Sequence, residues 1–94
     1  MNISTQIAYI PMHASGNLHH PDVEFGFVTS ICGDAAFCRY WRKGKPGVLR
    51  TVANSELTPL DMLVEHVSVA QVEVNRILKA ITGNRRVTFP SVGG

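Results

Sequence analysis

The fold of this chain is decided by residues 23–41, whose sequence is VEFGFVTSICGDAAFCRYW. Residues 23–31 are rich in aromatic and β-branched side chains, and such a run is typical of a β-strand. Residues 32–34, Cys-Gly-Asp, supply a tight turn. Residues 36–41 then return as a second strand, so we expect the two strands to be adjacent antiparallel partners.

The two faces of the second strand differ in chemistry. Alternate residues of a strand share a face, which groups Ala36, Cys38 and Tyr40 on one side and Phe37, Arg39 and Trp41 on the other. We expect the first face to point inward, because the second carries an arginine. The two cysteines, Cys32 and Cys38, are offset along the hairpin and too few for a disulfide scaffold or a zinc site. We therefore expect reduced thiols, with Cys38 buried.

The remaining strands are expected to be short. Proline ends the strand at 6–10, and glycines and a proline form the turn before the strand at 48–52. Thr58-Pro59 is a helix-start signal for a single turn. The segments expected on these grounds are strands at 6–10, 48–52 and 64–67, a loop at 12–22, a turn at 43–47 and one helical turn at 60–63. The alternative for 64–67 is that the helix at 60–63 continues through it.

A C-terminal helix is the clearest helical signal. Ser68 and Gln71 have the spacing of a capping box. Ala70, Val74, Ile77, Leu78 and Ile81 then fall on one side of the helix, and Glu73 and Arg76 can pair across one turn. Gly83 is the expected residue after the helix end. This pattern predicts a helix over about 69–82 and a flexible tail at 84–94.

These elements together predict one mainly β domain over residues 1–83, a small SH3-like antiparallel barrel of about five short strands with a C-terminal helix. The length of 94 residues fits a single domain. No run approaches the roughly 18 apolar residues that cross a bilayer. The first eleven residues have no basic start and no long apolar block, so they do not resemble a signal peptide. We expect the protein in the cytoplasm.

Part of the chain resembles a known group. The stretch from His13 to Ile31 contains a His-Ala-x-Gly loop, a His-Pro-Asp-x-Glu segment and Gly-x-Val-x-Ser-Ile. This pattern resembles short bacteriophage and prophage proteins, and the similarity continues loosely at 37–40 and 58–63, over about the first two-thirds of the chain. The resemblance implies an SH3-type barrel and a phage or prophage origin, hence the host cytoplasm. It implies no function, and the chain departs from the pattern after Leu63.

The loop at 12–22, here called the histidine loop, is the first candidate site. With the entry to the next strand it holds five polar side chains suited to ligand contact: His13, His19, His20, Asp22 and Glu24. Imidazoles and carboxylates also bind divalent metals, but this spacing matches no established zinc or calcium pattern. We therefore expect no metal or other cofactor, and a metal site in this loop stays open as an alternative. His20 and Asp22 are expected to hydrogen-bond loop amides around Pro21, with ligand contact as the alternative.

The second candidate is the segment 39–50, here called the basic hairpin. It carries five of the nine basic residues and no acid, although the net charge is only +2. Cations with interleaved aromatic rings suit phosphates and stacked bases. The expected binding residues are Arg39, Trp41, Arg42, Lys43, Lys45 and Arg50. The alternative is that these charges only solvate an exposed hairpin.

The function expected from these surfaces is binding, since the chain contains no Gly-x-Ser-x-Gly, phosphate-binding glycine loop or Cys-His pair typical of an enzyme. The first hypothesis is a phage accessory module that binds nucleic acid or a host protein through the basic hairpin. The second is a binder of a nucleotide-like small ligand, such as a sequestering anti-defence protein, that uses the histidine loop. The third is a virion structural or assembly protein that forms a homo-oligomer through Val69 and Val72 on the helix.

Overall fold

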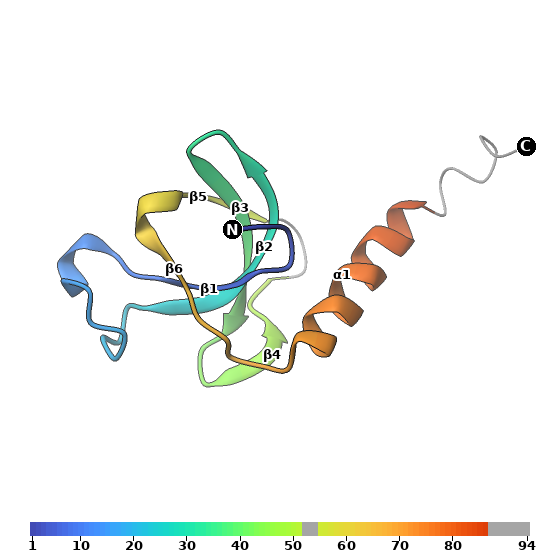
Figure 1. Cartoon of the computed structure of the whole chain (residues 1–94). Helices are drawn as coiled ribbons and strands as arrows, with labels where there is room; N and C mark the ends of the chain where they lie inside the picture. The colour runs from blue at the N-terminus through green and yellow to red at the C-terminus, as the bar shows by residue number, and fades with distance from the viewer. Residues whose placement is uncertain (52–54, 87–94) are drawn as a thin grey trace, which may run out of the picture.

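The computed structural model describes residues 1–51 and 55–86. Within them the chain is mainly β, with one C-terminal α-helix, as expected (Figure 1). The elements in chain order are β1 (Gln6–Tyr9), the 3₁₀ turn η1 (Met12–Ala14), β2 (Glu24–Cys32), β3 (Ala35–Arg42), β4 (Lys45–Leu49), β5 (Glu56–Pro59), the 3₁₀ turn η2 (Leu60–Met62), β6 (Leu63–Glu65) and α1 (Gln71–Arg86).

Strands β2 and β3 form the central antiparallel hairpin that the sequence predicts. Val28 pairs with Cys38, and the turn lies at Gly33-Asp34 because Cys32 pairs with Ala35. Gly26 is needed where the two strands approach closely, since a Cβ atom there would lie 2.0 Å from the carbonyl oxygen of Arg39. The position of the expected hairpin is therefore confirmed.

The sheet is built outward from this hairpin in the order β4-β3-β2-β1-β6. Strand β3 has two partners on its second edge. Its end pairs with β4 at Trp41↔Leu49, whereas its beginning pairs with β5 at Ala36↔Thr58. The pairings within residues 1–51 and 55–86 thus establish a six-stranded antiparallel sheet, and they do not include a ladder that closes it into the expected barrel.

Two short segments differ from the sequence-based expectation. The expected turn at 43–47 is only two residues long, with Gly44 at φ +70°, and β4 already begins at Lys45. Thr58-Pro59 ends strand β5, which the sequence did not predict, and Pro59 directly precedes the helical turn η2. The strand is held by the pairing of Thr58 with Ala36 and by a hydrogen bond of 2.8 Å between the hydroxyls of Thr58 and Tyr40. The expected single turn follows as η2, and the expected last strand is β6.

The start of α1 is also different from the expected capping box. The helix begins at Gln71, and Gln6 of β1 holds the residues just before it: its Oε1 accepts the backbone N–H of Ser68 and Val69 at 2.9 and 3.0 Å. The side chain of Gln71 instead donates to the carbonyl of Ser4. The helix continues past Gly83 to Arg86, so the expected tail is helical at 84–86, and its remainder lies outside the described residues.

The core lies on both faces of the central hairpin. Ala36, Cys38 and Tyr40 are buried as expected, and this burial raises the pKa of both the Cys38 thiol and the Tyr40 phenol. The other face of β3 is buried as well, which the sequence did not predict. Trp41 packs there against Phe27 with ring centroids 5.3 Å apart, and Val74 of α1 completes that cluster.

Helix α1 extends from one end of the sheet beside β4, and the histidine loop lies at the other side (Figure 1). The expected pair of Glu73 and Arg76 is present, with Nε of Arg76 2.9 Å from Oε1 of Glu73. No helix in the described part of the chain is long and apolar enough to cross a membrane.

Candidate binding site

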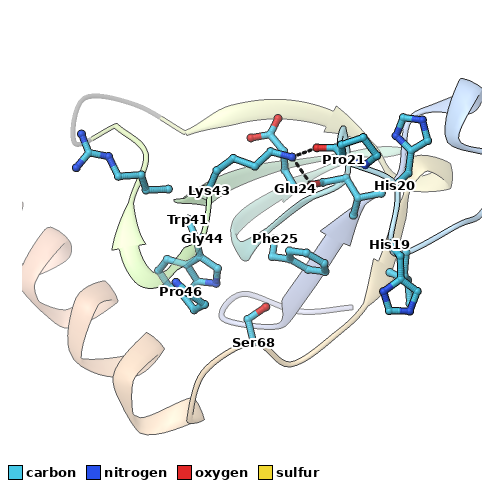
Figure 2. A pocket seen from close by; sticks show the side chains of 13 residues that line it. His19, His20, Pro21, Glu24, Phe25, Trp41, Lys43, Gly44, Pro46 and Ser68 are labelled. Carbon is cyan, nitrogen blue, oxygen red and sulfur yellow. Dashed lines mark hydrogen bonds between the residues drawn. The ribbon is translucent and has the colours of Figure 1, made fainter.

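A pocket of about 470 Å³ opens between the histidine loop and the basic hairpin (Figure 2). It therefore joins the two segments that the sequence presents as separate candidate sites. The loop and β2 contribute Leu18, His19, His20, Pro21, Val23, Glu24 and Phe25; the hairpin contributes Trp41, Arg42, Lys43, Gly44 and Pro46; Ser68 adds one side from the segment before α1. Its volume falls within the range of about 300–1,000 Å³ that small-ligand sites occupy.

Lys43 links the two sides of this pocket by hydrogen bonds. Its ammonium group donates to the carbonyl of Val23 at 3.1 Å and also to the carbonyl of Pro21 (Figure 2). Val23 is itself buried against Ala8 and Ala14, so the loop is anchored in a small apolar cluster. The pocket is thus formed by the folded chain before any ligand arrives.

The apolar lining includes two aromatic rings. Trp41 is 4% exposed, whereas Phe25 is half-buried. The ring of Phe25 is held by His66, with centroids 4.8 Å apart. Neither Phe25 nor Pro46 was a candidate from the sequence. Strand alternation places Phe25 and Phe27 on one face, but it does not show that Phe25 lies at the edge of the core.

The basic hairpin is not the exposed cationic surface that its sequence suggests. Arg39 is 6% exposed, its Nη2 donates to the carbonyl of Thr51 at 2.9 Å, and burial lowers its pKa. The expected exposure of Arg39 and Trp41 is therefore wrong, because β3 is covered on both faces.

Arg50 of the same hairpin is compensated by acids from other strands. Its guanidinium pairs with Glu24 at 3.3 Å and with Glu56, and it lies 5.5 Å from the centre of the Tyr40 ring. Arg42 and Lys45 are exposed and have no ion-pair partner among residues 1–51 and 55–86. Arg42 lines the pocket, and Lys45 does not.

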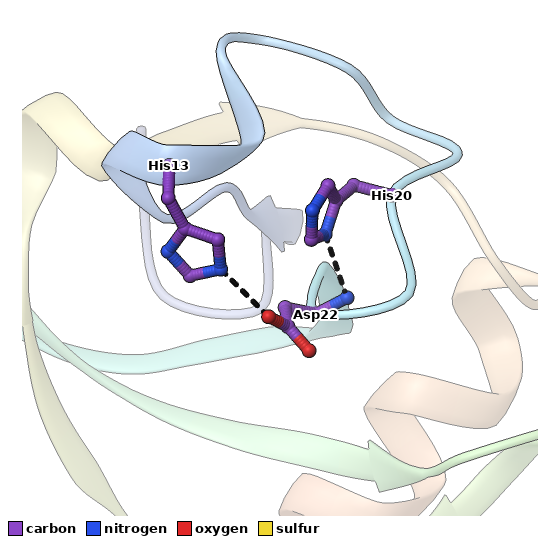
Figure 3. Close-up of side chains that lie close together, drawn as sticks. All are labelled: His13, His20 and Asp22. Atoms are coloured by element: carbon purple, nitrogen blue, oxygen red, sulfur yellow. Dashed lines mark hydrogen bonds and ion pairs between the residues drawn. The ribbon is translucent and has the colours of Figure 1, made fainter.

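Three polar residues of the histidine loop converge (Figure 3). Nε2 of His13 lies 2.6 Å from Oδ2 of Asp22, and the backbone N–H of Asp22 donates to Nδ1 of His20 at 3.0 Å. The second contact confirms the expected bond to a loop amide near Pro21. The pKa of Asp22 is lowered, chiefly by the hydrogen bond from His13 and further by the nearby positive charges of His13, His20 and Lys43.

The other candidates of the loop and the helix are separate from this cluster. His19 is exposed at the pocket, and Glu24 belongs to the ion pair with Arg50. Val69 is half-buried against the Trp41 cluster, so only Val72, 72% exposed, matches the expected apolar helix surface. Both cysteines are free thiols as expected, Cys32 exposed and Cys38 buried.

The chain matches no protein-family model, no curated protein and no solved structure. Its geometry alone defines the class of site. It is a preformed pocket with an apolar interior and a cationic edge, on a small antiparallel sheet.

Proposed function

We propose that the chain is a binding module that holds a small anionic ligand with a flat ring in the pocket between the histidine loop and the basic hairpin. A nucleotide is the simplest ligand of this chemistry. The observation that carries the proposal is the pocket itself, which joins the half-buried Phe25 ring to the exposed Arg42 within one preformed space.

The charges around the pocket support an anionic ligand. Glu24 is the one acid in the lining, and it is paired with Arg50. Arg42 has no ion-pair partner among the described residues, and guanidinium groups bind phosphate through two parallel hydrogen bonds. The exposed imidazole of His19 adds a further hydrogen-bonding group at the edge. An aromatic ring supports base stacking, which contributes about 1–3 kcal/mol per base.

The SH3-like barrel remains part of this proposal. It is supported by the three-residue η2, which links β5 directly to β6, while β6 pairs with β1 at Tyr9↔Leu63. The two ends of the sheet are therefore brought back toward each other. The resemblance to phage and prophage proteins supports a role in the host cytoplasm, where such a pocket would sequester its ligand.

The test is a calorimetric and NMR titration of the full chain, in EDTA, with nucleoside monophosphates and diphosphates and with a short single-stranded oligonucleotide. We expect a mononucleotide to shift the amide signals of Phe25 and Lys43 and to bind with a stoichiometry of one. Arg42→Gln should weaken this affinity about tenfold, because a charged hydrogen bond is lost. Lys45→Gln is the matched control, since it removes an exposed cation outside the pocket, and it should leave the affinity unchanged.

Two outcomes would overturn the proposal. One is that neither the mononucleotides nor the oligonucleotide bind in the millimolar range. The other is that only the oligonucleotide binds, with equal losses for Arg42→Gln and Lys45→Gln and a strong dependence on salt. That second result would assign the chain to nucleic-acid binding through surface charge and not to small-ligand binding in the pocket.

A further inference from the structure

His13, His20 and Asp22 form a compact set of potential metal ligands. Each offers one donor atom, and these atoms all lie within 4.8 Å of one another. The rings of His13 and His20 are nearly perpendicular, with centroids 5.1 Å apart, and Asp22 lies between them at one side (Figure 3). The set consists of two imidazole nitrogens and one carboxylate oxygen, and it faces open solvent.

The loop backbone holds these side chains at ordered positions. His13 lies in η1, which is closed by the bond from the N–H of Ala14 to the carbonyl of Pro11 at 2.9 Å. On the other side of the cluster, the N–H of Val23 donates to the carbonyl of His20 at 3.1 Å. Ala14 and Val23 are both buried, so each end of the ligand set is next to an anchored residue.

The donor atoms of His13 and Asp22 already face each other. The contact of 2.6 Å between them means that a nitrogen and an oxygen lone pair share one proton. A metal ion can replace that proton and draw both atoms to about 2.0–2.2 Å from itself. Nδ1 of His20 accepts the amide of Asp22, so His20 must give up that hydrogen bond to bind the metal through this atom.

We propose that His13, His20 and Asp22 form a surface site for a divalent first-row transition-metal ion such as Zn²⁺. Three protein ligands leave at least one coordination position open for water or a ligand atom. Imidazole donors select such ions over Ca²⁺ and Mg²⁺, which prefer oxygen ligands. The positive charge of Lys43 lies near Asp22 and opposes a further cation, so it weakens the affinity of the site for the ion.

This site adjoins the proposed ligand pocket, because His20 belongs to both. A bound ion at His20 would place positive charge at the edge of the pocket. The proposal concerns the metal alone, and its failure leaves the nucleotide titration in EDTA unaffected.

The experiment uses the untagged full chain carrying Cys32→Ser, which removes the exposed thiol as a competing ligand. Zn²⁺ is titrated by calorimetry, and Co²⁺ is titrated by visible absorption, which reports the coordination geometry. We expect one ion per chain and a shift of the imidazole signals of His13 and His20. The variants His13→Ala, His20→Ala and Asp22→Asn should each weaken binding tenfold or more, about the loss seen even for residues that only support metal ligands.

His19→Ala is the matched control, because it removes an exposed imidazole of the same loop that lies outside the cluster. It should bind Zn²⁺ as tightly as its parent. Each variant is checked for folding by its amide NMR spectrum, and Asp22→Asn keeps the size of the side chain. The proposal is overturned when the parent chain binds neither ion at millimolar concentration. It is also overturned when the cluster variants bind as the parent does, or when His19→Ala loses as much affinity as they do.

Discussion

In the basic hairpin, Trp41 and Arg39 are 4% and 6% exposed, whereas the side chains of His13 and Asp22 in the histidine loop are 61% and 60% exposed. Both segments are dense in polar and aromatic residues, but the fold uses them differently. In the hairpin, Arg39, Lys43 and Arg50 bond to other parts of the protein, whereas Arg42 and Lys45 have no ion-pair partner among residues 1–51 and 55–86. The loop directs its polar groups toward one another on the outside. The number of charged residues in a segment therefore predicts binding less well than the residues of neighbouring strands that pair with those charges.

The largest expected effect separates these two regions by stability. Trp41→Ala should lower the free energy of unfolding by about 3–5 kcal/mol, because it leaves a cavity between Phe27 and Val74. His13→Ala should change it by no more than about 0.5 kcal/mol, since the side chain is exposed. Urea unfolding followed by far-ultraviolet circular dichroism measures both. A loss below about 1 kcal/mol for Trp41→Ala would show that the hairpin is not covered by α1.

A smaller effect is expected from the inner face of the same hairpin. Thr58→Val should lower the free energy of unfolding by about 1–3 kcal/mol, because the buried hydroxyl of Tyr40 loses its partner at 2.8 Å. The shape of the side chain is kept, so packing changes little. Thr5→Val, at a half-buried threonine whose hydroxyl accepts the exposed backbone N–H of Asn2 at 3.0 Å, serves as the comparison for β-branched replacement with loss of an exposed hydrogen bond. Equal losses for both variants would mean that the bond to Tyr40 contributes nothing.

A third prediction compares two cations of the hairpin. Arg50→Gln should lower the free energy of unfolding by about 0.5–1 kcal/mol, since it breaks partly exposed ion pairs. Lys45→Gln should have no measurable effect, because Lys45 has no ion-pair partner among residues 1–51 and 55–86. The difference between the variants should shrink at high salt. Identical unfolding curves for the two variants would mean that the ion pairs of Arg50 add no stability and that its charge is only solvated, as the sequence suggests.

Most of the central architecture is predictable from the sequence, because the information is local. The run of aromatic and β-branched residues gives β2, and the Gly33-Asp34 turn sets its register with β3 as far as an irregularity between Val28 and Ser30 that the sequence does not show. The inward face with Cys38 and Tyr40 follows from strand alternation. The amphipathic stripe through Val74 gives α1.

The failures arise where distant residues outweigh local signals. Nothing near Thr58 shows that it pairs with Ala36, so the sequence predicted only a helix start there and missed strand β5. Nothing near Ser68 shows that Gln6 caps its amide. The pocket has the same origin, because the loop and the hairpin meet through the bonds from Lys43 to the carbonyls of Pro21 and Val23, which are distant in the sequence.

The smallest predicted effect is confined to the histidine loop. The pKa of Asp22 lies below its ordinary value of 3.8, chiefly because His13 hydrogen-bonds the ionised carboxylate. His13→Ala should therefore raise this pKa toward 3.8, and His19→Ala should not change it. A carboxyl ¹³C NMR titration in EDTA measures the three proteins.

The sign of the linked change in stability follows from the direction of that shift. A carboxylate whose pKa is lower in the folded chain stabilises the fold above the pKa of the unfolded state, and this contribution is lost as the pH falls through the folded value. The small deficit of His13→Ala should thus be present at pH 6 and should fade in acid, within the range of pH where Asp22 titrates. If the pKa of Asp22 is the same with and without His13, the two side chains do not meet in solution. The polar side chains of the loop would then be separate from one another in solution, and the loop would differ from the hairpin only in its exposure to solvent.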